Sequence, residues 1–301
     1  MIPLYDAHCH YQDDWFAPHR ARVFADLASA GIRRAVVNGT CETDWPVVAA
    51  LANEYPLVLP SYGLHPWDAG NRSPDWQKKL LAHIDAATTP TAGLPTVLPA
   101  IASATAGALA KVGEFGLDRW ILDRARPDDP RLAGLRRAPV DEQLEVFAWQ
   151  LDLAAARNLP ASIHCLDAFG PLLDALRHAK IPARGFLLHA YSGSAEMAKS
   201  FADLGAYFSF NGAFLEPRKQ RLRDVYVALP ADRVLVETDA PAMRLPAPLE
   251  KFSPLVAPDG SLANHPANLA VTYAALAELR GTTLELLAAQ VEKNFLRLFA
   301  A

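Results

Sequence analysis

Two histidines separated by one residue follow the first apolar run of the chain, in the segment PLYDAHCHYQD at residues 3–13. Because alternate residues of a β-strand point to the same face, His8 and His10 are expected to project together. Two neutral imidazoles side by side are a good beginning for a Zn, Mn, Co or Fe site, but a complete site needs further ligands, usually with carboxylates among them. Paired histidines also occur in surface loops and capping turns, so this segment alone does not predict a site.

Further polar residues stand at the C-terminal ends of other β-rich runs. They are His65, Glu114, His164, His189, Asn211, Glu237 and Asp239. A lone histidine in such a position is more often a hydrogen-bonded loop residue than a ligand. The shared placement of all these residues at strand ends nevertheless favours one common site.

Histidines from four strand ends, together with two carboxylates, are suited to two divalent metal ions bridged by one of the carboxylates. Such ions lower the pKa of a bound water and clamp the attacking and leaving oxygens of an ester or phosphodiester, so hydrolysis is the expected chemistry. Asp239 follows the apolar VLVET and is expected at the mouth of the fold. There it could both bind metal and accept the proton of the water.

The elements that must position these residues alternate between short β-rich runs and longer helical patterns. The predicted strands cover residues 4–8, 33–39, 57–65, 109–116, 161–165, 185–191, 206–212 and 234–240. Amphipathic stretches lie between them, such as residues 140–158 with the helical spacing of Leu144, Phe147, Leu151 and Ala154. Eight such units in 301 residues predict an α/β fold, a (β/α)8 TIM barrel that forms one domain over residues 1–301. The C-terminal ends of barrel strands form the rim on which active sites are built.

Three stretches exceed a minimal barrel. Residues 86–108 precede the fourth strand and are rich in Ala, Thr, Pro and Gly, which predicts an enlarged loop on the face opposite the chemistry. Residues 119–137 follow the fourth strand and contain six arginines and three aspartates. They could form a phosphate-contacting flap or a solvated excursion of mixed charge over the catalytic face. Residues 243–269 follow the eighth strand and could also border the site.

Composition narrows the class of protein. Hydrophobic content of 51% and charged content of 21% are typical of a soluble globular protein, without an apolar run long enough to span a membrane. The first residues lack the pattern of a secretory signal, and Cys9, Cys41 and Cys165 lack CxxC spacing, so the cytoplasm is the expected compartment. The net charge of −4 gives no global attraction for nucleic acid, so any phosphate binding must be local. The sequence contains no GxSxG elbow, no P-loop, no GxGxxG after a strand and no HExxH helix.

With these residues assembled, the sequence resembles the TatD-like family of metal-dependent hydrolases, within the wider amidohydrolase-like barrels. The blocks that carry the resemblance run in order through nearly the whole chain: DAHCH, GLHPW, KVGEFGLD, QLEVFAWQLDLAAARNLPASIHC, LLHAYSGS, RVLVETDAP and NHPANL. The resemblance implies one metal ion held by His8, His10, Glu114 and Asp239, and a second held by Glu114, His164 and His189. It also implies that His65 and Glu237 lie nearby as substrate-binding or supporting groups, although plain structural hydrogen bonding is an equal alternative for His65.

The resemblance further implies a phosphodiesterase of deoxyribonuclease type that acts on single-stranded nucleic-acid ends, or on a small phosphoester, with two divalent ions (Zn, Mn, Co or Mg). The family commonly has an arginine two residues after the histidine of the fifth strand, whereas this chain has Leu166. Contacts to a nucleic-acid backbone could come from the arginines of 119–137 or from Arg218, Lys219, Arg221 and Arg223, although a solvated helix face is favoured for this second group.

Two other functions remain open. The replaced arginine and the enlarged loops would allow a hydrolase of a small ester, lactone or amide. Glu114, which stands where many barrels of the wider group have a carboxylated lysine, favours the phosphodiesterase instead. A non-catalytic metal-binding scaffold is disfavoured because it would not need two carboxylates beside four histidines at one rim. The sequence predicts no oligomeric state.

Overall fold

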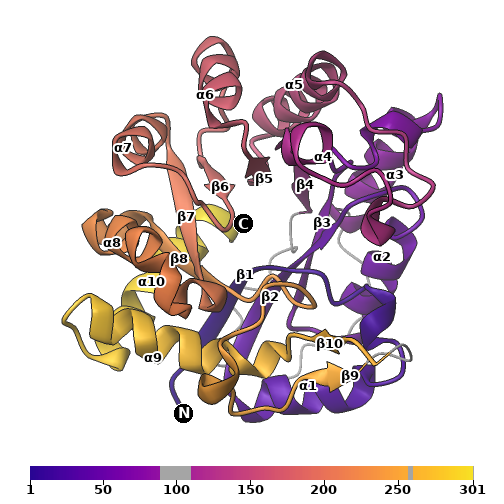
Figure 1. The fold of residues 1–301 in the computed structure, drawn as a ribbon. Helices are drawn as coiled ribbons and strands as arrows, with labels where there is room; N and C mark the ends of the chain where they lie inside the picture. The colour runs from indigo at the N-terminus through magenta and orange to yellow at the C-terminus, as the bar shows by residue number, and fades with distance from the viewer. Residues whose placement is uncertain (89–109, 257–259, 301) are drawn as a thin grey trace.

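The structure is a computed structural model that describes residues 1–88, 110–256 and 260–300. Eight parallel strands pair in the order β1 to β8 around a nearly closed barrel (Figure 1). Their bounds are β1 Leu4–Cys9, β2 Ile32–Gly39, β3 Val58–Tyr62, β4 Lys111–Asp118, β5 Ala161–Leu166, β6 Phe186–Leu188, β7 Ala206–Asn211 and β8 Val234–Glu237. The predicted TIM barrel is therefore confirmed, and each predicted strand differs from the observed one only at its ends.

Backbone hydrogen bonds just beyond β8 join the last strand to the first. Asp239 N donates to His8 O at 3.0 Å, and His10 N donates to Ala240 O at 2.9 Å. These two bonds place the segment that carries Asp239 against the segment that carries both histidines. The closure of the barrel thus assembles part of the candidate site.

Helices surround the strands in Figure 1. Their bounds are α1 Arg20–Ser29, α2 Trp45–Glu54, α3 Trp76–Thr88, α4 Trp120–Asp123, α5 Val140–Arg157, α6 Phe169–His178, α7 Ala195–Asp203, α8 Gln220–Ala228, α9 Leu269–Leu279 and α10 Leu284–Phe299. Within the described ranges, no helix is long and apolar enough to cross a membrane.

Helix α5 shows how the apolar spacing positions the helices. Phe147, Leu151 and Ala154 are buried, and Leu144 packs against the same core. The Phe147 ring lies 5.5 Å from the ring of Phe115 in β4, and burying such a side chain contributes about 2 kcal/mol. The helix ends at Asn158, whose φ of +49° is the left-handed conformation common after a helix.

Two glycines allow the strands that carry the site to approach one another closely. A Cβ on Gly116 of β4 would lie 1.9 Å from His164 O in β5, and a Cβ on Gly63 would lie 2.5 Å from Glu114 O. Any side chain at these positions would force the neighbouring strands apart. The GEFG motif therefore serves strand packing, and it places Glu114 and His164 side by side.

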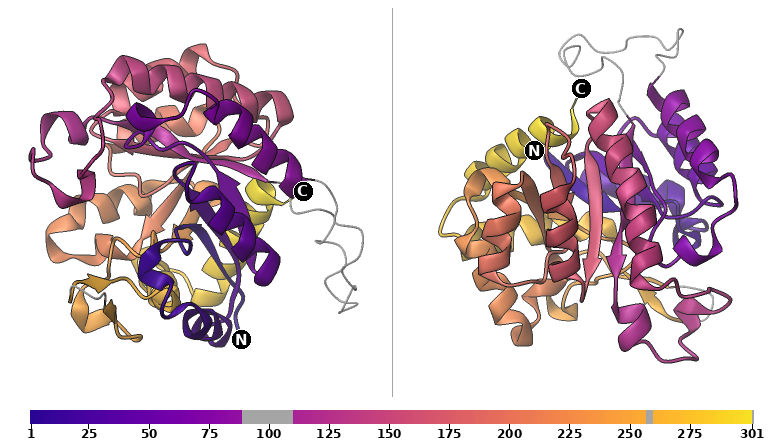
Figure 2. Two further views of the ribbon diagram at one scale, coloured as in Figure 1. Left: turned by 90° about the vertical axis from the view of Figure 1, so that its right-hand side faces the viewer. Right: turned by 90° about the horizontal axis from the view of Figure 1, so that it is seen from above.

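The segments beyond a minimal barrel differ in how far they match the predictions. Residues 86–88 are the last residues of α3, so the predicted loop at 86–108 was wrong at its start, where two alanines extend the helix. The rest of that stretch, 89–108, lies outside the described residues. The segment after β4 contains α4 and a 3-10 turn at Pro130–Leu132, on the side to which the visible strand arrows point (Figure 2, right). The segment after β8 contains a small hairpin of β9 Leu255–Val256 and β10 Leu262–Ala263, which the sequence did not predict.

Candidate metal centre

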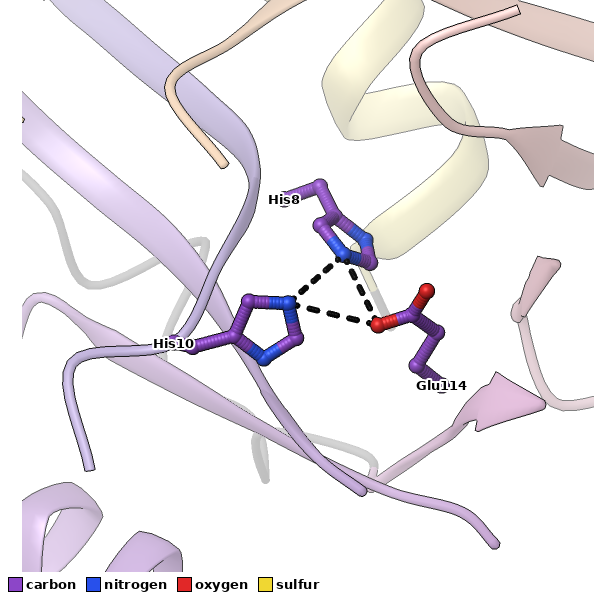
Figure 3. A group of neighbouring side chains, drawn as sticks. All are labelled: His8, His10 and Glu114. Atoms are coloured by element: carbon purple, nitrogen blue, oxygen red, sulfur yellow. Dashed lines mark hydrogen bonds and ion pairs between the residues drawn. The ribbon is translucent and has the colours of Figure 1, made fainter. Parts of the chain in front are cut away.

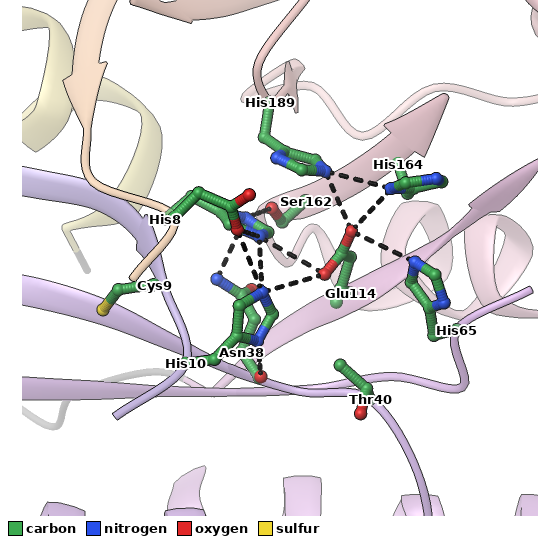
Figure 4. Close-up of polar contacts among 12 residues, drawn as sticks. His8, Cys9, His10, Asn38, Thr40, His65, Glu114, Ser162, His164 and His189 are labelled. Atoms are coloured by element: carbon green, nitrogen blue, oxygen red, sulfur yellow. Dashed lines mark hydrogen bonds and ion pairs between the residues drawn. The ribbon is translucent and has the colours of Figure 1, made fainter. Parts of the chain in front are cut away.

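The carboxylate of Glu114, in β4, lies between two pairs of histidines. Its Oε2 is 3.3 Å from His8 Nε2 and 3.2 Å from His10 Nε2 (Figure 3). Its Oε1 is 2.9 Å from His164 Nδ1 and 2.8 Å from His189 Nε2 (Figure 4). Each oxygen of one carboxylate therefore faces its own histidine pair, an arrangement that lets the carboxylate bridge two cations.

Asp239 lies on the side of the first pair. Its Oδ1 is 3.3 Å from His10 Nε2 and 3.7 Å from His8 Nε2. The residue follows β8 with a φ of +49°, and its side chain is 12% exposed. The carboxylate thus contacts the histidines and also lines an open cavity, which is described below.

His65, which follows β3, joins the side of the second pair. Its Nε2 is 3.4 Å from Glu114 Oε1, and its ring centroid is 4.4 Å from that of His164. Among the described residues, three groups of three could each hold a metal ion, because the ligand atoms of each group lie within 4.8 Å of one another. The groups are His8, His10 and Glu114; His8, His189 and Asp239; and His65, Glu114 and His164. His65 is accordingly placed where either a ligand or a substrate-binding group would lie.

Hydrogen bonds to the second ring nitrogen orient these histidines. His10 Nδ1 is 2.8 Å from the carbonyl oxygen of Asn38, which can only accept, so Nδ1 carries the proton and Nε2 is free to bind metal. His164 Nε2 is 3.2 Å from Asp118 Oδ2, which leaves Nδ1 facing Glu114. His8 Nδ1 is 2.9 Å from Ser162 Oγ.

Sequence reasoning did not single out Asn38, Ser162 or Asp118. Asp118 had a usable signal, because it follows Glu114 by four residues on one strand and so points to the same face. Asn38 acts from the neighbouring strand β2 and Ser162 from β5, which does not pair with β1, and their spacing to the histidines along the chain carries no such signal.

Glu237, at the end of β8, lies below His189. It is fully buried, accepts hydrogen bonds from Ser209 and from Asn211 Nδ2, and its Oε1 is 3.9 Å from His189 Nδ1. Burial raises the pKa of Glu237. His189 Nδ1 is itself buried and has no hydrogen-bond partner among the described residues. Of the two roles expected for Glu237, this position favours support of His189 over contact with substrate.

The charges of the cluster depend on its burial. Burial favours the protonated form of Glu114, but the neighbouring histidines, His189 and His65 first, hold its pKa well below the usual value. Burial lowers the pKa of His8 to about 3, so this imidazole is neutral. Two ionised carboxylates among imidazoles form a nitrogen and oxygen donor set that suits Zn, Mn or Co, so the residues present fit a divalent metal.

A cavity of about 630 Å³ opens above the cluster. Its lining includes the metal-side residues His10, His65, Glu114, His164, His189 and Asp239. The lining away from them includes Asp13, Asp14, Asp44 and Asp68, with Thr40 and Cys41. The described residues that line this cavity include no lysine or arginine.

The six arginines of residues 119–137 mostly bind groups of the protein itself. Five of them form ion pairs with carboxylates: Arg119 with Asp123, Arg124 with Asp167, Arg126 with Asp128, Arg131 with Asp129, and Arg136 with Glu142. The sixth, Arg137, donates to three backbone carbonyls. Arg124 Nε lies 3.2 Å from the carboxylate of Asp167, which adjoins Leu166. In the group after β7, Arg223 donates to the carbonyls of Phe214 and Glu216 at 2.7 Å, whereas Arg221 is exposed.

The chain is similar to known proteins along nearly its whole length. Residues 5–300 match the model of the family described as TatD related DNase. The chain is 29% identical over 294 residues to the uncharacterized metal-dependent hydrolase YjjV of Escherichia coli, covering 98% of this chain and 96% of the relative. It is 28% identical over 297 residues to the 3'-5' ssDNA/RNA exonuclease TatD of Salmonella typhimurium, covering 98% of each. The crystal structure of YjjV superposes with a TM-score of 0.78 at 27% identity over 99% of both chains.

Proposed function

The chain belongs to the TatD-related DNase family of metal-dependent hydrolases, and from this premise we propose that it removes nucleotides from the 3′ ends of single-stranded nucleic acid. A relative of similar length is named as an exonuclease of this kind, and it matches along nearly the whole chain. The observation that carries the proposal is the position of Glu114, whose two carboxylate oxygens each face one histidine pair.

We assign two divalent ions to this centre. His8, His10, Glu114 and Asp239 would hold one ion, and Glu114, His164 and His189 would hold the other. When bound, divalent ions lower the pKa of water and offset the charge that develops on a phosphoryl group. The donor set accepts Zn, Mn, Co or Mg according to availability.

The residues of the chain would supply proton transfer and positioning. Burial favours the protonated form of Asp239, but its hydrogen bond with His10 and the nearby histidines lower its pKa, so the carboxylate is ionised and able to accept a proton in the cavity. His65 lines the same cavity and can contact a phosphoryl oxygen or the sugar next to it.

A second candidate function is hydrolysis of a small ester, lactone or amide. The cavity favours it in one respect, because the described lining has several aspartates and no lysine or arginine. Such walls attract uncharged or cationic groups more readily than a chain of phosphates. Any contact with further phosphates would then come from residues outside the cavity.

We propose the cytoplasm as the compartment of this enzyme. Cys9 is buried, Cys41 and Cys165 are partly exposed, and all three are free thiols. Free thiols persist most readily under reducing conditions.

The direct test is hydrolysis of a 5′-labelled single-stranded oligonucleotide by the purified protein with Mg, Mn, Co or Zn, and with a chelator. We expect a ladder that shortens one nucleotide at a time, loss of activity with chelator, and a decrease of about 100-fold or more for Asp239→Asn. Equal activity in metal-free protein would contradict the proposal. Turnover of small esters with intact oligonucleotide would favour the second function.

A further inference from the structure

We propose that Trp67, Trp120 and Arg131 form a stacking subsite for a nucleobase beside the scissile bond. This inference rests on the proposed nuclease function and specifies how the substrate would be held. The three side chains come from two segments, the loop after β3 and residues 119–137.

The two indoles lie near one another with almost parallel rings, and together they provide an aromatic surface. The ring centroids of Trp67 and Trp120 are 6.1 Å apart, and the ring planes differ by 22°. Both side chains are only partly buried. An aromatic pair that served packing alone would be expected to be covered, whereas partly exposed faces can accept a base, since every base has a π-face.

This surface begins at the metal centre. Trp67 lines the cavity, and its ring centroid lies 5.7 Å from that of His65. Trp67 Nε1 donates to Asp118 Oδ2 at 2.7 Å, and the same carboxylate oxygen is 3.2 Å from His164 Nε2. A base on the indoles would therefore lie a short way from the residues that we propose as metal ligands.

Arg131 completes the subsite with a fixed positive charge. Its Cζ lies 4.6 Å from the ring centroid of Trp120 and 5.9 Å from that of Trp67. Asp129 Oδ1 accepts from Nε at 3.0 Å and Asp129 Oδ2 accepts from Nη2 at 2.7 Å, so the guanidinium plane is held in place. The bonds to Asp129 use Nε and Nη2 rather than Nη1, and the side chain remains 58% exposed. Nη1 is thus available for a phosphate. The described lining of the cavity contains no lysine or arginine that could serve this purpose.

The test compares two substrates, because a merely structural role would affect both alike. One single-stranded oligonucleotide carries natural bases, and its partner carries abasic residues at the two 3′-terminal positions. For Trp120→Ala we expect KM for the natural substrate to rise about five- to a hundredfold, with kcat changed little and with no change for the abasic substrate. Trp120→Phe should retain most of the discrimination.

Two arginine variants provide a matched comparison. Arg131→Gln should raise KM for the natural substrate several-fold, whereas Arg126→Gln should leave it unchanged, because Arg126 is 75% exposed on the same segment and its side chain pairs with Asp128 rather than with the indoles. If wild type cleaves the oligonucleotide and Trp120→Ala alters both substrates equally or neither, the subsite is overturned while the nuclease function stands. If wild type cleaves neither oligonucleotide with any metal, the nuclease function and the subsite are both overturned.

Discussion

The single residue Asp118 connects the candidate metal centre to Trp67 and to the start of α4. Its Oδ2 contacts His164 and accepts from Trp67, and its Oδ1 accepts from Ile121 N at 3.1 Å. A carboxylate on the second nitrogen of a histidine ligand fixes the ring and increases the basicity of the nitrogen that binds metal. By this contact Asp118 would influence a metal ion bound at His164 without being a ligand itself.

For Asp118→Asn we predict metal affinity about 10- to 100-fold lower at the His164 side, with the fold retained. The substitution keeps the size of the side chain and removes the charge that supports His164. Competition with a chromophoric chelator measures the affinity. Asp123→Asn is the control, because Asp123 lies in α4, is half exposed and pairs with Arg119, the residue just before that helix. Equal affinities of wild type and Asp118→Asn would show that Asp118 holds Trp67 and Ile121 but does not support metal binding.

The residues of the site differ in how far the sequence predicts them. The six predicted ligands lie within or just after the barrel strands and converge in the structure: His8, His10, Glu114, His164, His189 and Asp239. The sequence predicted both the kinds of side chain, histidines and carboxylates, and their position on the rim of the barrel. The roles of Asn38 and Ser162 depend on contacts between strands, which no spacing along one strand reveals.

At the scale of elements, α5 and the segment before it are held together by Glu142. The carboxylate accepts from Arg136 Nη1 at 2.9 Å and Nη2 at 2.6 Å, and also from Arg72 in the loop after β3. These hydrogen bonds, the one with Arg136 first, lower the pKa of Glu142 from 4.5 to about 2. The ion pairs thus tie the two segments that carry Trp67 and Trp120 to one helix.

For Glu142→Gln we predict a loss of about 1 kcal/mol in the free energy of unfolding at pH 7, a modest value because Arg136 is half exposed. Because the pKa is lower in the folded state, the stabilisation is present above about pH 4.5 and is lost as the pH falls toward 2. Urea unfolding across this range should show the difference between wild type and variant shrinking with acidity.

Asp141→Asn is the matched control, since both residues lie in the first turn of α5 and share its helix dipole. It should cost less than Glu142→Gln at pH 7. A difference between wild type and Glu142→Gln that is independent of pH would contradict the ion-pair account.

The elements also differ in predictability. The eight strands were predicted because apolar β-rich runs recur between helical patterns, and α5 was predicted from its apolar spacing. The hairpin of β9 and β10 was missed because strands of two residues have no period to detect. The two interpretations of residues 119–137 could not be separated, because each arginine has acidic residues near it in the sequence and only the fold decides which partners it meets.

At the scale of the whole molecule, the barrel brings together residues from β1 to β8 that are up to 231 positions apart, from His8 to Asp239. The two backbone hydrogen bonds between the β1 and β8 segments bring Asp239 to His8 and His10. The packing of β4 against β5 brings Glu114 to His164. The centre therefore depends both on barrel closure and on the packing of β4 against β5. The net charge of −4 leaves the attraction of a nucleic acid to local groups such as Arg131.

We propose that Glu114 joins two metal ions in one hydrolytic centre. The measurement that tests it most directly is titration of metal-free protein with Mn or Zn, in which bound metal per chain and oligonucleotide cleavage are followed together, for wild type and Glu114→Gln. We predict two bound ions per wild-type chain with full cleavage only when both are present, and fewer than two tightly bound ions with almost no cleavage for Glu114→Gln. Two equally tight ions and wild-type cleavage in Glu114→Gln would contradict the account.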